Sequence, residues 1–481
     1  MLSFNTATFL PILPQILLLI LGAVILILDL VMPKQARRNL GWVTAVGMGL
    51  ILLLMLPARP DLQPTLSWGS MISHDWLGYT FTMLFIFSAG ITALFAMDFG
   101  ELGTRGEFYI LMIASTIGMT FMASAADLVM LYLAIESTSI PLYIMAGFLI
   151  RDDKSTEAGF KYLLFGAMTS AIMLYGFSLL YGFSGTTSLS QIASSFLQCN
   201  ISNPALIASM LLILVGFGFK ISVVPLHFWA PDVYEGAPTP VAGFLSTASK
   251  AAGFAVLVRV LMLVFPNNLG AWGLVLSALA VATMTLGNLI ALTQRNIKRM
   301  LAYSSIAHAG YILIGVVTIT ELGLTGVVYY LIAYLLTNLA AFGIVSAYGR
   351  VAGSDEMTAY YGMSRRSPWL ALALLVALLS LAGMPPFGGF IAKVLVFAAA
   401  VNSQMVWLAI VGVLNSIVGV YYYLTVLKYV YLYHSDDDDK PVPITRPYKL
   451  ALIILVAGIL LVGTLFTPWF NWASIAAKAM F

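Results

Sequence analysis

Ionisable side chains stand inside apolar runs of this sequence at four places. Glu136 lies in LYLAIESTSIPLY, Lys220 in GFGFKISVVP, Lys250 in FLSTASKAAGF and Lys393 in GGFIAKVLVF. One charge at the centre of a membrane helix costs roughly 2.5–3.5 kcal/mol. Three lysines share one acid, so at least two lack a partner in this chain, and an unpaired buried lysine tends to release its proton. These residues therefore predict groups that carry protons within a membrane, rather than ion pairs that only hold helices together.

The backbone around two of these lysines carries residues that interrupt helices. Pro225 follows Lys220 by five residues, and Pro385 and Pro386 stand shortly before Lys393 in LAGMPPFGGF. Proline removes a helix hydrogen-bond donor, and its ring clashes with the preceding turn. Interrupted backbone at membrane depth is tolerated where it is buried in protein or lines a cavity that holds water. We therefore expect Lys220 and Lys393 to lie beside breaks in helices seven and twelve, next to water or polar backbone groups.

The composition places these charges in a membrane protein. Of 481 residues, 61% are hydrophobic and 9% are charged, with a mean hydropathy of +0.97, whereas a soluble domain carries about 25% charged residues. The net charge of +3 is too small to favour nucleic acid as a partner. Cys199 is the only cysteine, which excludes a disulfide framework or a cysteine-ligated metal or cluster within this chain. The sequence predicts an all-α protein that crosses the lipid bilayer many times.

Apolar runs of roughly 20 residues, the length that crosses about 30 Å of hydrocarbon, predict about fourteen transmembrane helices. They lie near 9–31, 39–57, 75–98, 106–123, 126–149, 158–183, 203–228, 238–264, 269–292, 297–319, 323–346, 367–400, 404–431 and 448–469. The first three spans form an N-terminal segment, residues 1–100, and a loop with the last span forms residues 432–481.

Basic residues are distributed unequally between the two ends of these spans. Loops that follow odd-numbered spans, with the adjoining span ends, hold 17 of the 23 Lys and Arg, whereas the opposite face holds two, Arg59 and Lys478. Because cytoplasmic loops carry the excess of basic residues, these loops are predicted to be cytoplasmic and both termini to lie on the outer, periplasmic face. Arg259 lies within a span but near its outer end, so we expect its side chain to extend to the membrane surface.

The ionisable residues recur along the chain at a nearly constant interval. Lys393 follows Lys220 by 173 residues, each on an interrupted helix, and His308 follows Glu136 by 172. This interval predicts two copies of one five-helix unit, made of spans four to eight and nine to thirteen. Five is an odd number, so consecutive copies would be inverted across the membrane, as in many secondary transporters. The alternative interpretation of His308 is a core histidine whose hydrogen bonds are satisfied.

The two predicted copies occupy residues 106–264 and 269–431. Lys250 has no ionisable counterpart, because the same interval leads to Tyr422, so we expect Lys250 to link the copies near the middle of the protein. Protons would enter through one copy, cross by the central groups and leave through the other.

Three stretches of the sequence resemble a known family. PLHFWAPDVYEGAPTPVAGFLSTASKAAGF, QRNIKRMLAYSSIAHAGY and LAGMPPFGGFIAK are similar to motifs of the antiporter-like membrane subunits of respiratory complex I, the NADH–quinone oxidoreductase. The likeness runs over nearly the whole chain. The sequence FLSTASKAAGF is more similar to subunit N of that complex than to subunits L or M, or to the sodium–proton antiporter subunits of the same superfamily.

The resemblance implies a fold of fourteen core helices and a role in proton translocation. It implies that Glu136 pairs with Lys220, that Lys250 is the central lysine, and that Lys393 is the exit group. It implies other complex I subunits as partners, especially neighbouring antiporter-like and small membrane subunits. Those partners would hold the FMN, iron–sulfur clusters, NADH and quinone, with no cofactor bound by this chain. The implied location is the inner membrane of a bacterial cell.

Three functions are compatible with the sequence. The first is a proton-translocating subunit of complex I, with a ferredoxin-dependent photosynthetic relative as a close variant. The second is a cation/proton antiporter subunit of the same superfamily, and the third is a structural membrane subunit that conducts nothing. Sodium exchange would favour acidic oxygen ligands at mid-depth, and Glu136 is the one clear candidate. This favours the first function.

Overall fold

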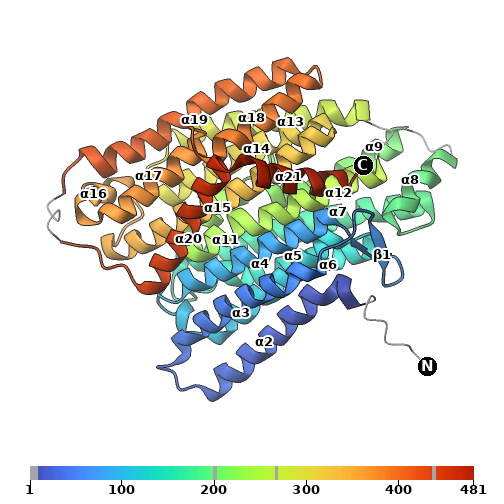
Figure 1. The fold of residues 1–481 in the computed structure, drawn as a ribbon. Coiled ribbons are helices and arrows are strands. Elements are labelled where there is room, and N and C mark those ends of the chain that lie inside the picture. Colours follow the sequence, from blue (N-terminus) through green and yellow to red (C-terminus); the bar gives the residue numbers. More distant parts are fainter. Residues whose placement is uncertain (1–8, 199–202, 266–268, 436–439) are drawn as a thin grey trace.

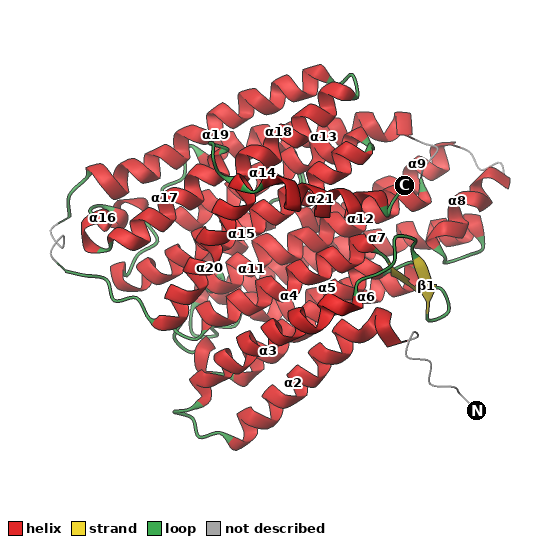
Figure 2. Ribbon diagram, viewed as in Figure 1, coloured by secondary structure: helices red, strands yellow, loops and turns green. Residues whose placement is uncertain are grey.

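The computed structural model describes residues 9–198, 203–265, 269–435 and 440–481. This part of the chain is almost entirely helical, and most of its helices lie side by side along roughly one direction (Figures 1 and 2). Cys199 lies outside the described residues.

The helices range from single turns to 32 residues. In chain order the α-helices are α2 (Leu13–Val31), α3 (Leu40–Met55), α4 (Trp76–Ala96), α5 (Gly106–Ser124), α6 (Leu128–Ala146), α7 (Asp153–Ser184), α8 (Leu189–Gln198), α9 (Asn203–Ile221), α10 (Trp229–Gly236), α11 (Thr239–Phe244), α12 (Lys250–Val264), α13 (Leu269–Ala291), α14 (Ile297–Thr318), α15 (Glu321–Ala352), α16 (Met363–Arg366), α17 (Pro368–Ala382), α18 (Gly388–Asn402), α19 (Val406–Leu432), α20 (Arg446–Thr464) and α21 (Phe466–Lys478). Short 3₁₀ turns lie at Leu10–Ile12, Arg37–Asn39, Leu56–Ala58, Leu102–Thr104 and Met357–Tyr360, and β1 (Thr65–Ser67) pairs with β2 (Ile72–His74) in an antiparallel hairpin.

Thirteen helical segments in the described part of the chain are long and apolar enough to cross a membrane. Two shorter apolar helices, α17 and α18, follow one another where the twelfth span was predicted. The predicted class, an all-α polytopic membrane protein, is confirmed. The fourteen predicted spans correspond to thirteen long segments and one helix that is divided in two.

The centre of the bundle is formed by α14 and α15, in which nearly every residue is buried. α11 and the π-helical turn before α12 pack against α15. At the edge of the molecule, α2, α3 and α19 leave apolar side chains such as Leu30, Leu53 and Ile417 exposed (Figure 1). Lipid tails are as apolar as these side chains, so a surface of this kind is suited to the bilayer.

Two helices are interrupted, as predicted. α9 ends at Ile221 and α10 begins at Trp229, with Ser222 between them at φ 60°. α17 ends at Ala382 and α18 begins at Gly388. Both interruptions coincide with the prolines that the sequence places there, because proline cannot continue the hydrogen-bond pattern of a helix.

A third irregularity was not predicted. The turn Leu245–Ser249 is π-helical and leads directly into Lys250, the first residue of α12. π-helical turns inside α-helices are rare and occur frequently at functional sites. Neither proline nor glycine marks this turn, so the sequence carried no recognisable signal for it.

Arg259 does not extend to the membrane surface, and that prediction is wrong. Its side chain is 2% exposed and donates two parallel hydrogen bonds to Asp75, at 2.8 and 2.9 Å. Asp75 also caps α4 by accepting from the backbone N–H of Gly78. A bidentate carboxylate satisfies a guanidinium well, so Arg259 is held inside the protein instead of reaching water. The pair joins α12 to the start of α4.

The predicted spans also left out several elements, namely the hairpin, α8, α10, α16 and α21. α21 follows α20 and lies across the ends of α4 and α15. Trp472 donates to the hydroxyl of Thr80 at 2.8 Å, and Lys478 lies 3.5 Å from Glu321. The last predicted span therefore ends earlier, at Thr464, and a separate short helix follows it.

The same local structure occurs twice, 168 or 169 residues apart. Asp127 caps α6 and forms an antiparallel bridge with Ser188, whereas Asn296 caps α14 and forms an antiparallel bridge with Glu356. The helices that lead to the bridge partners, α7 and α15, are both 32 residues long and both end at a glycine with positive φ.

Replacing Asp75 by Asn would leave the Arg259 guanidinium buried without a counter-charge. Loss of one member of a buried ion pair costs about 3–5 kcal/mol. We therefore expect Asp75→Asn to lower the thermal midpoint of unfolding of the purified protein by several degrees. The matched control is Asp61→Asn, at an exposed position, and equal midpoints for the two variants would contradict the prediction.

The same pair has a defined pH dependence. Burial raises the pKa of Asp75, but Arg259 and the hydrogen bonds from Gly78 and Ser73 outweigh burial and lower it overall. A carboxyl with a lowered folded-state pKa contributes stability above its unfolded-state pKa and loses it as the pH falls through the folded-state value. The difference between wild type and Asp75→Asn should thus stay constant between about pH 6 and 8 and shrink only in acid.

Candidate functional site: buried ionisable groups in the bundle

Lys220 stands in the last turn of α9, directly before the first break. Its side chain is 5% exposed, and its ammonium group has no hydrogen-bond partner among the described residues. Glu136, in α6, accepts a short hydrogen bond from the hydroxyl of Ser170 in α7. In the described structure Glu136 is therefore held by a hydroxyl group and Lys220 by no direct partner. A buried amine without an acceptor is costly, which favours a functional role for Lys220.

Lys250 is almost completely buried, and its ammonium is hydrogen-bonded to a single residue. Its ammonium donates to the backbone carbonyl of Ser305 at 2.8 Å and also to the hydroxyl of the same residue. Ser305 belongs to α14, so this contact joins the two predicted five-helix units, as the sequence suggested for Lys250.

His308, in α14, is held between two tyrosines. Its Nδ1 lies 2.6 Å from the hydroxyl of Tyr330 in α15, and its Nε2 lies 3.2 Å from the hydroxyl of Tyr423 in α19. The Tyr423 hydroxyl also shares a short hydrogen bond with Ser304. A neutral imidazole has one donor and one acceptor, and a tyrosine hydroxyl can act as either. This series of hydrogen bonds can therefore reverse its direction while the heavy atoms stay in place.

Lys393 lies in α18 beside the second break. Its ammonium donates to the carbonyl of Ala382 at 2.9 Å and lies 4.9 Å from the centre of the Tyr311 ring. Carbonyls at the end of a helix have no intrahelical donor, and an aromatic face attracts a cation. The expectation that this lysine lies beside polar backbone at a helix break is confirmed.

Several polar residues of the buried row were missed by the sequence analysis. Asn338, in α15, donates to the hydroxyls of Ser246 at 2.7 Å and of Tyr334 at 3.0 Å. Tyr330, Tyr334 and Asn338 are spaced four residues apart, which places them on one face of a helix. This polar stripe in an apolar helix was the readable signal, and a search limited to ionisable residues overlooked it.

The repeated caps and bridges align the two halves of the chain with an offset of 168 or 169 residues, which differs from the predicted interval of 172 or 173. Glu136 lies nine residues after its helix cap, Asp127, and Ser305 lies nine residues after the matching cap, Asn296. By this count Ser305, rather than His308, corresponds to Glu136. The interval of 172 arose because only ionisable residues were compared.

The two lysines beside the breaks, Lys220 and Lys393, also lie on opposite sides of the break in their helices. Lys220 precedes the break in its helix, whereas Lys393 follows the break between α17 and α18. A hydroxyl residue therefore takes the place of the acid in the second half, and that residue, Ser305, holds Lys250.

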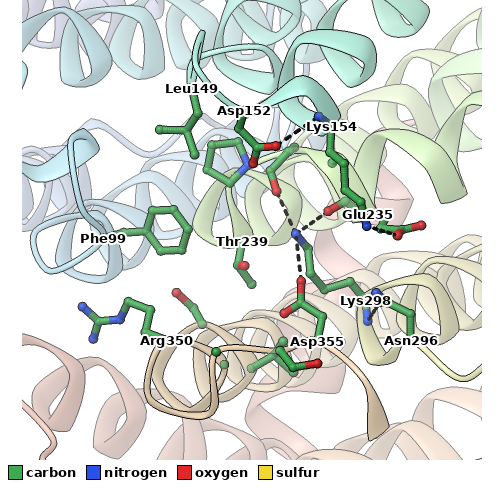
Figure 3. Close-up of a pocket in the computed structure, with 18 of the residues that line it drawn as sticks. Phe99, Leu149, Asp152, Lys154, Glu235, Thr239, Asn296, Lys298, Arg350 and Asp355 are labelled. Atoms are coloured by element: carbon green, nitrogen blue, oxygen red, sulfur yellow. Dashed lines mark hydrogen bonds and ion pairs between the residues drawn. The ribbon is translucent and has the colours of Figure 1, made fainter. Parts of the chain in front are cut away.

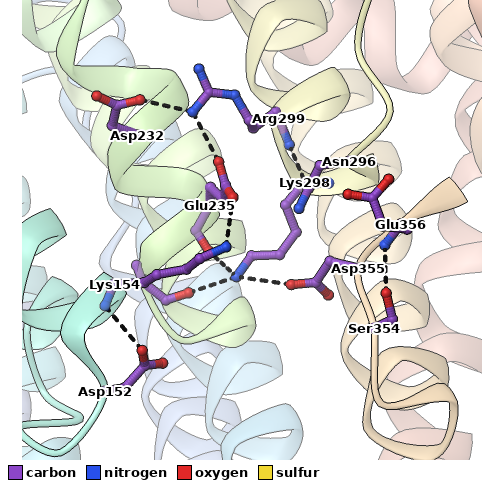
Figure 4. Close-up of polar contacts among 11 residues, drawn as sticks. Asp152, Lys154, Asp232, Glu235, Asn296, Lys298, Arg299, Ser354, Asp355 and Glu356 are labelled. Carbon is purple, nitrogen blue, oxygen red and sulfur yellow. Dashed lines mark hydrogen bonds and ion pairs between the residues drawn. The ribbon is translucent and has the colours of Figure 1, made fainter.

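A cluster of ion pairs surrounds α10, beyond the first break (Figure 4). Asp232 and Glu235 accept from Arg299 at 2.8 and 2.9 Å, and Lys161 and Lys154 approach them from α7 at 2.6 and 3.0 Å. Burial raises the pKa of both carboxyls, but the hydrogen bonds from these cations outweigh it and leave each pKa below its usual range. Both carboxylates are thus charged at neutral pH, and α10 is held from two sides.

Together the buried groups form a row of proton donors and acceptors through the centre of the bundle. Within the described ranges, no three His, Cys, Asp or Glu side chains come together in a way that could hold a metal ion. The nitrogen and oxygen atoms of these side chains can donate and accept hydrogen bonds.

The family model described as "NADH:quinone oxidoreductase/Mrp antiporter, TM" matches residues 125–419. The chain belongs to this family. A relative from Moorella thermoacetica, named NADH-quinone oxidoreductase subunit N, is 44% identical over 469 residues, which are 97% of this chain and 98% of the relative. A relative of the same name from Trichlorobacter lovleyi is 40% identical over 487 residues, 99% of this chain and 98% of the relative.

Solved structures share the fold of this chain. A chain of respiratory complex I from Thermus thermophilus aligns with a TM-score of 0.81 and 32% identity, over 95% of this chain and 98% of that one. A chain of the Mrp complex from Dietzia aligns with a TM-score of 0.87 and 21% identity, over 98% and 97%. At that lower identity the Mrp comparison shows the fold alone.

The contrast between Lys220 and Lys250 predicts opposite effects of the same substitution. A buried amine without a partner destabilises the folded protein by about 1–3 kcal/mol. Lys220→Met removes that amine and should therefore raise the thermal midpoint of unfolding. Lys250→Met instead leaves the Ser305 oxygens without their donor and should lower the midpoint. Thermal unfolding of both purified variants tests this, and a lower midpoint for Lys220→Met would show that Lys220 is paired.

Proposed function

We propose that this chain is a membrane-arm subunit of an NADH–quinone oxidoreductase and moves protons across the membrane during quinone reduction. The observation that carries the proposal is the buried row of Lys220, Lys250, His308 and Lys393, each within the bundle and three of them bound to oxygen atoms. The relatives named subunit N, at 44% and 40% identity over almost the whole chain, support this assignment.

In this mechanism the proton passes between neighbouring groups of the row. Lys220 receives it near Glu136, and Lys250 holds it against Ser305 in the second half of the chain. His308 passes it onward through the hydroxyls that contact its ring nitrogens, and Lys393 is the last group. Each step exchanges a proton between a nitrogen or oxygen atom and the next, so no covalent bond to the protein skeleton is made or broken.

The electrostatic switch in this mechanism is the interaction between Glu136 and Lys220. Two opposite charges about 4 Å apart at an effective dielectric constant near 20 interact by about 4 kcal/mol. Moving one charge against 100 mV costs about 2.3 kcal/mol. Loss of the pair is thus large enough to drive a proton from Lys220, whereas formation of the pair favours the protonated lysine. Glu136 accepts from Ser170, and Lys220 has no hydrogen-bond partner among the described residues, which supports a separated state of the pair.

The paired caps, bridges and long helices support two five-helix units, residues 106–264 and 269–431, in inverted orientation. Inverted copies would give one unit access to each side of the membrane. The excess of basic residues in odd-numbered loops supports a cytoplasmic position for those loops and an outer position for both termini. The location proposed is the inner membrane of a bacterium.

Redox chemistry belongs to other subunits in this proposal. NADH, FMN, the iron–sulfur clusters and quinone would be bound by partner chains, and this chain would bind none of them. Among its partners are other antiporter-like and small membrane subunits, which would lie beside it in the bilayer. The antiporter alternative has less support, because its solved neighbour shares only 21% identity. A purely structural subunit would leave the buried row without a use.

Lys220→Ala tests the proposed function directly. We expect NADH-driven proton pumping by inside-out membrane vesicles to fall by on the order of 10²-fold, the contribution of a positioned proton-transfer group, with coupled quinone reduction reduced in parallel. Assembly of the complex is checked on a native gel. The control is Lys478→Ala, whose side chain is 63% exposed. If an assembled Lys220→Ala complex pumped protons at the full rate, the proposal would be wrong and the chain would be a structural subunit that conducts no protons.

The role of His308 is tested through its hydrogen-bond partner. Tyr330→Phe removes the hydroxyl that lies 2.6 Å from Nδ1, and we expect about fivefold slower pumping, the effect of losing about 1 kcal/mol. Tyr329→Phe is the matched control, because its hydroxyl bonds the carbonyl of Val462 instead. Equal pumping by the two variants would reduce His308 to a core residue with satisfied hydrogen bonds.

A further inference from the structure

Lys298, in the first turn of α14, is an almost completely buried cation outside the proposed proton row. Its side chain is 6% exposed, and its ammonium donates to the backbone carbonyls of Glu235 at 2.5 Å and Ala237 at 2.9 Å. These carbonyls lie at the C-terminal end of α10, where a helix leaves acceptors without donors and favours a positive charge. Lys298 therefore caps α10 from another helix (Figure 4).

The opposite end of α10 is attached to the helix of Lys220. The indole N–H of Trp229, the first residue of α10, donates to the carbonyl of Phe219 at 3.0 Å. The same indole stacks on Tyr162 of α7 with ring centres 4.5 Å apart. α10 thus connects the end of α9, where Lys220 lies, to the clamp at Lys298.

Beyond Ala237 the chain runs directly to Lys250. α11 and the π-helical turn fill the interval, and Lys250 then donates to Ser305. Lys298 and Ser305 are seven residues apart on α14, which is two turns and about 10 Å along one face. One face of α14 therefore holds this segment at both ends. The π-helical turn between those ends is the place where such a segment can change its register.

We propose that Lys298 is a positioning residue that clamps the α10–α11 junction onto α14 and thereby keeps Lys250 in register with Ser305. Release of the clamp lets the segment shift at its π-helical turn and separates Lys250 from its acceptor. Because α10 is also attached to the end of α9, a movement at Lys220 reaches Lys250 through this clamp. The inference rests on the proposed function and adds a link between two of its proton-carrying groups.

The surroundings of Lys298 offer its ammonium a cavity and a second partner. A cavity of about 500 Å³ lies beside it, with Thr239, Arg350 and Asp355 among the lining residues (Figure 3). The Asp355 carboxylate lies 3.8 Å from the ammonium, so it offers a second partner on the cavity side. The ammonium can exchange the carbonyls of α10 for this carboxylate by a small rotation.

The neighbouring cations hold α10 in a different way. Arg299 and Lys154 bind the carboxylate of Glu235, and neither donates to the carbonyls that end α10. Lys154 is the matched control, because its side chain is 69% exposed and it contacts the same residue as Lys298. Removing Lys154 takes a positive charge from Glu235 but leaves the clamp.

The experiment compares Lys298→Met, Lys298→Arg and Lys154→Met in the assembled complex. Two quantities are measured: the number of protons pumped per NADH oxidised, and hydrogen–deuterium exchange of the amides of residues 229–238. For Lys298→Met we expect fewer protons per NADH and exchange faster by on the order of tenfold, the effect of losing hydrogen bonds to a charged group. Lys298→Arg should restore part of both, and Lys154→Met should match wild type.

The outcomes separate this inference from the proposed function. If Lys298→Met showed faster exchange but pumped as many protons per NADH as wild type, the clamp would be merely structural and the inference would be wrong. Unchanged exchange in Lys298→Met would also overturn the inference. If Lys220→Ala also pumps normally, the proposed function itself fails. Should Lys298→Met not assemble, Lys298→Gln replaces it, because its amide keeps the buried position polar while its shorter, uncharged side chain cannot reach both carbonyls of α10. A reduced ratio with Lys298→Gln then supports the clamp, and a full ratio overturns it.

Discussion

Inside a bilayer, a polar group that finds no partner in the protein has no water to bond instead. The structure depends on this constraint at each buried cation. Lys393 uses a carbonyl released where α17 ends, and Lys250 uses both oxygens of Ser305. Lys298 uses the carbonyls that end α10. The ends of interrupted helices therefore supply the acceptors of Lys393 and Lys298, whereas Lys250 takes its acceptors from a serine of the continuous helix α14.

Lys220 departs from this pattern. It lies beside a break, as Lys393 does, yet its ammonium has no hydrogen-bond partner among the described residues. A group in that position has the most to gain from a nearby carboxylate or from losing its charge. Burying a charge without a partner costs free energy. The other buried cations avoid this cost through their hydrogen bonds, so Lys220 is the cation whose charge depends most on a change in its surroundings.

The two most buried helices supply most of the partners. α14 carries Lys298, Ser305 and His308 along its length, and α15 carries the stripe of Tyr330, Tyr334 and Asn338. Both helices are continuous, whereas the lysines that contact them lie beside a break or a π-helical turn. The bundle thus combines two rigid central helices with interrupted helices around them. A shift of an interrupted helix relative to α14 or α15 would change which acceptor each buried lysine contacts.

Ion pairs near the ends of the bundle join neighbouring helices to one another. Arg259 and Asp75 join α12 to α4 through a buried bidentate pair. Arg299 joins α14 to both carboxylates of α10. Exposed pairs of this kind contribute little to stability, but buried and shared ones restrict how helices can move.

The sequence by itself determined the class, the spans, the breaks at the prolines and the four ionisable residues in apolar runs. Each of these follows from composition or from local chemistry: apolar length, the missing N–H of proline, and the cost of a charge in hydrocarbon. Only the tertiary structure decided the partners. The pairing of Arg259 with Asp75, 184 residues apart, and that of Lys250 with Ser305 depend on which helices meet. No local signal marks them, because a serine hydroxyl or a helix-end carbonyl becomes an acceptor only when packing brings a donor to it.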